Sequence, residues 1–177
     1  ISNNDLISTN QFYIKGLNRD KIPDVVLFVN GLPIVVIELK DAKNEDATVH
    51  KAFTQLTNYQ KAIPDLFAYN GLLVISDGLD ARTGTISSGF DRFLAWKSID
   101  GKRDASRTTP QIETLVLGML RPEVLLDLIR NFTVFEVEKK TLDDGSLEMN
   151  TVKKMAAYHQ YFAVQKAIDS TITATTG

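Results

Sequence analysis

The sequence contains no cysteine, which excludes disulfide bonds, thiolate nucleophiles and Cys-ligated metals, and favours a reducing compartment. It lacks a long apolar run: the longest stretches, residues 25–29 and 32–37, are far shorter than the roughly 20 residues of a membrane-spanning helix. It also lacks a positive excess, because 20 Lys and Arg against 22 Asp and Glu leave a net charge of −2. We therefore expect a cytoplasmic protein with no membrane segment and no global basic field for DNA.

The composition is that of a globular protein. Of the 177 residues, 44% are hydrophobic and 24% are charged, with only 10 Gly and 5 Pro. These proportions predict a buried core, and the length suits one domain or one domain plus part of a second. The sequence begins at Ile1 without an initiator Met or a signal pattern, so we expect a preceding segment.

The first half of the sequence predicts a sheet. Segments rich in apolar and β-branched residues predict strands over residues 11–15, 24–29, 34–39, 72–76, 83–86 and 93–98. The Asn30-Gly31 dipeptide between the second and third of these is the strongest short-range signal for a hairpin. Apolar residues three or four apart then predict a helix over about 46–62, which Pro64 ends.

The second half predicts helices. Residues 101–109 form a polar loop, followed by helices over 111–120 and 123–131, with Pro122 in the first turn of the second. A charged turn is expected at 141–145 and a last amphipathic helix from about 152 to 170. The predicted fold class is α/β: a mixed β-sheet flanked by helices, with a helical C-terminal extension.

Three charged residues are predicted to meet at one end of the hairpin. A turn centred on Gly31 places Asp24 opposite Glu38, and alternation places Lys40 on the face of Glu38. Two carboxylates at the end of apolar strands repel each other unless a cation compensates them. With the carbonyl of Leu39 they suit Mg²⁺, which can activate a water, while Lys40 stabilises charge on a phosphate. The alternative is a solvated Glu38–Lys40 pair where the strands leave the core.

These residues resemble a nuclease signature. Ile22-Pro23-Asp24, thirteen residues and then Glu38-Leu39-Lys40 resemble the Pro-Asp…Asp/Glu-x-Lys motif in the restriction and motor subunit of type I restriction-modification enzymes. The Gln-x-x-x-Tyr motif of that family is matched by Gln55 and Tyr59, which share one helical face. Further segments that resemble the subunit are residues 29–33, 75–80 and 158–164.

The resemblance implies a role for each motif residue. It implies that Asp24 and Glu38 bind the metal, Mg²⁺, and that Lys40 is the catalytic lysine. It also implies that Gln55 and Tyr59 support DNA handling. In related helicases a Gln ahead of the motor recognises adenine, which implies, more weakly, a nucleotide-binding role for Gln160 in residues 158–164.

The resemblance further implies a restriction-endonuclease-like core that hydrolyses phosphodiester bonds of double-stranded DNA. It implies an ATP-driven motor domain elsewhere in the subunit, and modification and specificity subunits as partners. This sequence has no phosphate-binding loop, so we expect that motor to be absent from it. The implied division is an endonuclease core over 1–109, a helical extension over 110–150 and a linker helix over 151–177.

Two other functions stay open. One is a free-standing repair or recombination nuclease of the same fold, and the other is a non-catalytic docking domain in which the three charges form only an ion cluster. Elsewhere, Trp96 is either a core residue or a platform for stacking on a base. The loop around Lys102 carries a local excess of two positive charges; it is either a solvated loop, the favoured interpretation, or the best local candidate for phosphate contacts. His50 and His159 are expected to be structural or surface residues.

Overall fold

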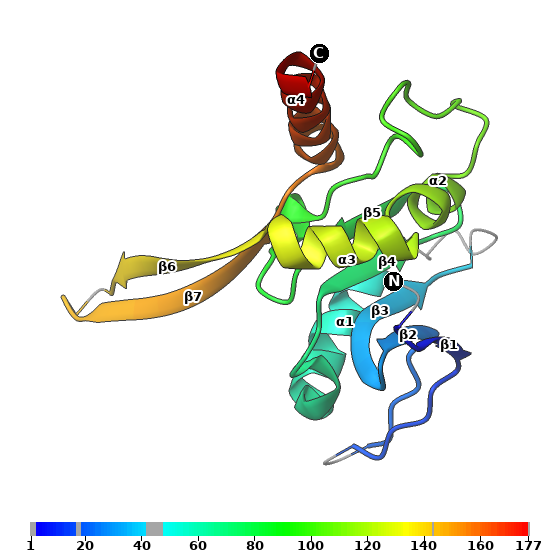
Figure 1. Cartoon of the computed structure of the whole chain (residues 1–177). Helices are drawn as coiled ribbons and strands as arrows, with labels where there is room; N and C mark the ends of the chain where they lie inside the picture. The colour runs from blue at the N-terminus through cyan, green and yellow to red at the C-terminus, as the bar shows by residue number, and fades with distance from the viewer. Residues whose placement is uncertain (1–2, 17–18, 42–47, 143, 177) are drawn as a thin grey trace.

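The computed structural model describes residues 3–16, 19–41, 48–142 and 144–176. Its centre is a five-stranded sheet with the order β1-β2-β3-β4-β5. The strands are β1 (Leu6–Asn10), β2 (Val25–Val29), β3 (Leu32–Leu39), β4 (Leu72–Ser76) and β5 (Ala81–Gly84). Strands β3 and β4 are parallel and the other neighbours are antiparallel. The sheet is therefore mixed and, with helices on its faces, confirms the predicted fold class (Figure 1).

The β2–β3 hairpin forms as its sequence predicts. Both residues of the Asn30-Gly31 turn have positive φ, +52° and +80°, which a two-residue turn of this hand requires. Val26 lies opposite Val36, so the same register extended by two residues places Asp24 opposite Glu38. The register of the hairpin is therefore sufficient by itself to place the two carboxylates opposite each other.

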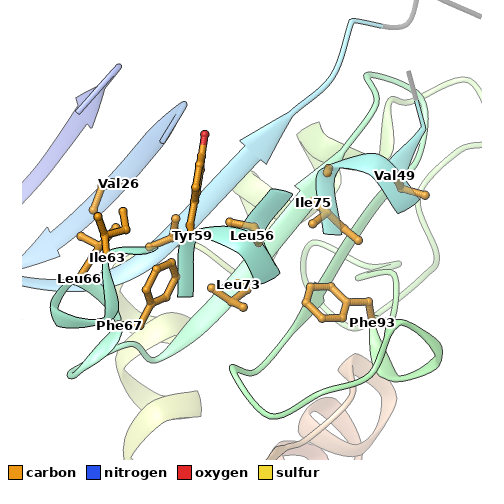
Figure 2. Packing of buried hydrophobic residues seen from close by; sticks show 12 residues of the cluster. Val26, Val49, Leu56, Tyr59, Ile63, Leu66, Phe67, Leu73, Ile75 and Phe93 are labelled. Carbon is orange, nitrogen blue, oxygen red and sulfur yellow. The ribbon is translucent and has the colours of Figure 1, made fainter. Parts of the chain in front are cut away.

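Helices cover both faces of the sheet. On one face lies α1 (Val49–Ala62), which begins after its N-cap Thr48 and makes the crossover from β3 to β4. Residues 46 and 47 of the predicted helix lie outside the described residues. The cluster on this side is shown in Figure 2; its members include Leu56, Tyr59, Phe67, Leu73, Ile75 and Phe93. A short 3₁₀ helix, Pro64–Phe67, follows α1 where the predicted stop at Pro64 falls.

The other face is covered by α2 (Gln111–Gly118), α3 (Pro122–Asn131) and the first turns of α4 (Tyr158–Thr176). Its cluster is built from β3 and β4 residues of opposite parity to those facing α1; the largest members are Leu72, Trp96, Leu115, Met119, Leu128 and Tyr161. Because both faces are apolar, a charge at the end of β3 lies next to two cores.

Two predicted strands are wrong. The first strand is residues 6–10 rather than 11–15, because Gln11 adopts a left-handed φ of +49° and ends the strand; beyond it Ile14 makes only an isolated bridge with Lys21. Residues 93–98 form no strand either. Phe93 is buried on the α1 side and Trp96 on the α2–α3 side, so this segment passes from one core to the other. A 3₁₀ helix, Phe90–Arg92, precedes it.

The largest correction is a second hairpin. Strands β6 (Thr133–Thr141) and β7 (Leu147–Met155) form a two-stranded ribbon that extends away from the rest of the molecule (Figure 1). The predicted helix from 152 is therefore wrong at its start, and α4 begins at Tyr158. Of the turn expected at 141–145, residue 143 lies outside the described residues; at the tip of the ribbon the N–H of Gly145, which has a φ of +79°, donates to the Leu142 carbonyl at 2.9 Å.

The ribbon is amphipathic. Phe135, Val137, Leu147 and Met149 share one face by alternation and cross-strand pairing, and each is more than half exposed. At its base the ribbon is anchored by Lys153, whose Nζ donates to the Asn70 carbonyl at 2.6 Å. Among the described residues, no helix has both the length and the hydropathy to cross a membrane.

Candidate active site

The predicted convergence of charged residues is present at one edge of the sheet. Asp24 lies immediately before β2, Glu38 and Leu39 are the last two residues of β3, and Lys40 follows directly after the strand. The backbone N–H of Leu39 donates to Asp24 Oδ2 at 2.8 Å, which ties the two strands together at the carboxylate. Asp24 Oδ1 accepts a second bond, at 3.0 Å, from Nε2 of Gln11.

Glu38 is the buried charge of the site, with only 1% of its surface exposed. Its Oε1 lies 2.6 Å from Lys40 Nζ, whereas Oε2 is buried without a hydrogen-bond partner in the structure. Burial raises the pKa of Glu38 to about 7; the bond from Lys40 opposes this rise, and the negative charge of Asp24 adds to it. Among the residues that the structure describes, this carboxylate oxygen therefore lacks a hydrogen-bond partner.

This arrangement fits a hard divalent cation. Buried polar atoms without a partner are rare, and a carboxylate oxygen beside a second carboxylate is the donor chemistry that Mg²⁺ uses. Among the described residues there is no cluster of three or more His, Cys, Asp or Glu that could hold a metal. A metal here would therefore rely on Asp24, Glu38, a backbone carbonyl and water, and Mg²⁺ commonly keeps several waters.

Helix α1 supplies the residues that hold Lys40. Gln55 Oε1 accepts a bond from Lys40 Nζ at 2.6 Å, and Gln55 Nε2 donates to the hydroxyl of Tyr59 at 2.6 Å. The Tyr59 hydroxyl then donates to the carbonyl of Ile22 at 3.3 Å. Figure 2 shows the Tyr59 ring beside the α1 cluster with its hydroxyl directed away from Phe67. The predicted pair Gln55 and Tyr59 is thus joined to the predicted lysine.

The donors and acceptors of these hydrogen bonds determine which end of the Gln55 amide faces Lys40. Burial raises the pKa of Tyr59, and the charges of Glu38 and Asp24 add to the effect, so the phenol keeps its proton. The Tyr59 hydroxyl uses its one proton to donate to the Ile22 carbonyl, so towards Gln55 its oxygen can only accept a hydrogen bond. The NH₂ group of Gln55 must therefore face Tyr59. The Gln55 carbonyl oxygen is then left for Lys40, which places the ammonium between the helix and Glu38.

Gln160 and Trp96 lie elsewhere. Gln160 Oε1 accepts from the backbone N–H of Ala157 at 2.9 Å, a capping bond at the start of α4. Trp96 is 2% exposed and packs against the rings of Tyr158, Tyr161 and Phe162, which confirms the core interpretation.

The sequence analysis missed Gln11 as a site residue. Its side chain contacts Asp24 because β1 ends at Asn10 and the next residue adopts a left-handed backbone. The available signal was the pairing of β1 with β2, in which Asn10 lies opposite Val25 and Gln11 is next in line with Asp24. A Gln gives no sequence indication of positive φ, and the misplaced first strand concealed the pairing.

The burial of Glu38 predicts how the metal-free protein responds to pH. Its pKa is about 7 in the folded protein, against an ordinary value of 4.5, so the folded form binds this proton more tightly than the unfolded chain does. The group's contribution to stability is complete below pH 4.5 and is lost as the pH rises towards 7, by up to about 3 kcal/mol.

Urea unfolding in EDTA between about pH 5 and pH 8 measures this dependence for wild type and Glu38→Gln. The variant cannot ionise, so we expect its stability to match wild type at the acid end and exceed it at the alkaline end. Parallel pH curves for the two proteins would contradict the assignment of the pH dependence to Glu38.

Comparison with known proteins gives a consistent family. Residues 1–92 match the family model for the type I restriction enzyme R protein N terminus. The chain is 44% identical over 98% of its length to the type I restriction enzyme HindI endonuclease subunit of Haemophilus influenzae, covering 16% of that subunit. It is 29% identical over 97% of its length to the putative MjaIXP endonuclease subunit of Methanocaldococcus jannaschii, covering 17%. The chain thus spans about a sixth of the length of these relatives.

Proposed function

This chain belongs to the family of type I restriction enzyme R protein N termini, and we propose that it is the metal-dependent DNA endonuclease domain of such an enzyme. The observation that carries the proposal is the buried, unpartnered Oε2 of Glu38, placed at the strand end that Asp24 and Lys40 share. A solvated surface pair, the alternative, would leave both oxygens in water. Here the carboxylate is 1% exposed.

Asp24, Glu38 and the carbonyl of Leu39 would hold Mg²⁺. When bound, the ion supplies a water of lowered pKa as the nucleophile for the phosphodiester. Lys40 contributes independently of the ion. Its ammonium has three N–H donors, of which one bonds Glu38 and one bonds Gln55, so one is left for an oxygen of the scissile phosphate. Its side chain is 19% exposed, so that donor is within reach of DNA.

The hydrogen-bonded chain through Gln55 and Tyr59 orients that donor. Because Lys40 is held from two directions, little side-chain entropy remains to be lost when the negatively charged transition state forms. Gln55 and Tyr59 therefore act by positioning the lysine, which gives their proposed support of DNA handling a physical basis.

Titration calorimetry with Mg²⁺ or Mn²⁺, on wild type and Glu38→Ala, tests the function. A nuclease site binds the ion in wild type and loses it in the variant. If neither protein binds an ion, the chain is instead a non-catalytic docking domain, in which Asp24, Glu38 and Lys40 form only a structural ion cluster. A free-standing repair nuclease is the less favoured enzyme because the relatives are named as subunits of type I enzymes.

The wider setting is also part of the proposal. The domain acts on double-stranded DNA in a complex with modification and specificity subunits, and ATP hydrolysis by a motor domain elsewhere drives translocation. Sequence recognition belongs to the specificity subunit, so this domain cuts with little sequence preference. An adenine contact by Gln160 remains a separate prediction, distinct from the capping bond that its Oε1 accepts from the Ala157 N–H.

DNA binding by this chain alone is expected to be weak. Its net charge is −2, and the loop over residues 97–107, the candidate segment for phosphate contacts, carries an excess of only two charges. About two to four phosphate contacts give a slope of log K against log salt of roughly −2 to −4. Binding to a duplex of about 30 base pairs between about 50 and 200 mM salt measures this slope. Nanomolar affinity with a steeper slope would mean that the domain holds DNA unaided.

A further inference from the structure

Gln11 has an unusual backbone for its residue type. Its φ is +49°, and among the described residues the only other non-glycine with positive φ is Asn30, in the β2–β3 turn. Asn adopts this region comparatively easily because its short side chain bonds locally, whereas Gln has no such preference. The protein therefore holds Gln11 in a conformation that costs free energy, and Gly would occupy the position without that cost.

The strained backbone brings three hydrogen bonds onto the Pro23-Asp24 dipeptide. The N–H of Gln11 donates to the Asp24 carbonyl at 2.8 Å, and the N–H of Phe12 donates to the Pro23 carbonyl at 3.2 Å. The third bond comes from the Gln11 side chain, whose Nε2 donates to Asp24 Oδ1 at 3.0 Å. The two backbone bonds fix where the chain passes, and only the third depends on the side chain being Gln.

The side-chain bond completes the support of Asp24. Its Oδ2 is held by the Leu39 N–H, so with Gln11 on Oδ1 the carboxylate is held at both oxygens, from β3 and from the end of β1. Each oxygen keeps a lone pair for a further ligand. A neutral amide suits this place, because Lys or Arg would cancel the negative charge a cation needs, and Asp or Glu would repel Asp24.

We propose that Gln11 is a positioning residue that orients the carboxylate of Asp24 for the catalytic cation. This inference rests on the proposed function. It explains why a residue ill suited to a left-handed backbone is present where glycine would make the protein more stable. The Gln11 side chain orients Asp24, and the strained backbone lowers the stability of the fold. A structural role predicts the reverse, since removing the side chain would then lower stability.

The test uses two variants that differ only in backbone strain. Gln11→Gly removes the amide and relieves the positive φ, whereas Gln11→Ala removes the amide and keeps the strain. We expect both to bind Mn²⁺ at least about tenfold more weakly than wild type by titration calorimetry, the usual loss for a group that supports a metal ligand. Without metal, the melting temperature of Gln11→Gly should equal or exceed that of wild type, and Gln11→Ala should lie below Gln11→Gly.

Asn30→Gly is the matched control, because it also relieves a positive φ and removes side-chain hydrogen bonds, here with Asp5 and Asn4, at the end of the β2–β3 hairpin far from Asp24. It should leave Mn²⁺ affinity unchanged. Wild-type Mn²⁺ affinity in Gln11→Gly would overturn the inference while leaving the proposed function intact. So would a lower affinity accompanied by a lower melting temperature, since that marks a structural residue. A loss confined to DNA affinity would make Gln11 a DNA contact instead. If wild type binds no Mn²⁺, the proposed function itself is wrong.

Discussion

Alanine at Asp24, Glu38 or Lys40 is expected to reduce DNA cleavage by the assembled enzyme to below a few per cent of wild type. Glu38 and Lys40 share a 2.6 Å contact, and Asp24 is tied to the same strand end through the Leu39 N–H at 2.8 Å. Removing one of the three side chains therefore shifts the position of the other two or leaves a charge without its partner. Residues that act as one unit are strongly non-additive, so the triple variant should be no worse than the single ones.

The three alanine variants should still fold. A plasmid cleavage assay alone cannot distinguish a folded inactive variant from an unfolded one, so folding must be measured separately. Glu38→Ala removes a buried carboxylate with one unpartnered oxygen, while Lys40 keeps its bond to Gln55 and part of its exposure to solvent, so the protein should stay folded and ATP-driven translocation should stay near wild type. The matched control is Lys154→Ala, which breaks an exposed pair with Glu136 of the same 2.6 Å length on the ribbon. It should cut normally. Residual cutting above a few per cent in any of the three site variants would show that they do not form one site.

The parts of this site that could be predicted depend on short-range rules. The Asn30-Gly31 turn sets the register of β2 and β3, and the register alone aligns Asp24 with Glu38. Alternation places Lys40 with Glu38, and the spacing of Gln55 and Tyr59 places both on one face of α1. Each inference spans few residues, so no knowledge of the packing was needed.

The remaining features depend on packing between distant segments. The unpartnered Oε2 of Glu38 and its raised pKa arise because two cores close around the end of β3, which no local pattern encodes. The β6–β7 ribbon was missed for a related reason. Val152 and Met155 are three residues apart, as on a helix, and the pairing of β7 with β6 overrides that local signal. The apolar face of the ribbon is also exposed, so the usual rule that apolar residues of a strand face a core does not apply to it.

Removal of divalent metal is expected to abolish cleavage in the otherwise intact enzyme. The proposed ligands are hard oxygens, Cys is absent from the sequence, and Glu38 Oε2 has no hydrogen-bond partner among the described residues. Exhaustive dialysis against EDTA should therefore stop cutting, and Mg²⁺ or Mn²⁺ should restore it. Circular dichroism before and after dialysis controls for unfolding, which we do not expect because neither hydrophobic core includes a residue of the proposed metal site.

Calcium distinguishes binding from chemistry at the same site. Ca²⁺ accepts the same oxygen donors, but it coordinates them at about 2.3–2.6 Å with more ligands, against about 2.0–2.1 Å for octahedral Mg²⁺. Glu38 is held by Lys40, and Asp24 is held at both oxygens, so these carboxylates cannot readily follow the longer coordination distances. Ca²⁺ should therefore fail to support cleavage and should inhibit competitively when added to the Mg²⁺ enzyme. Cutting that persists undiminished in EDTA would exclude a metal mechanism. Failure to cut with Ca²⁺ but without competition against Mg²⁺ would show that Ca²⁺ does not bind at the catalytic site.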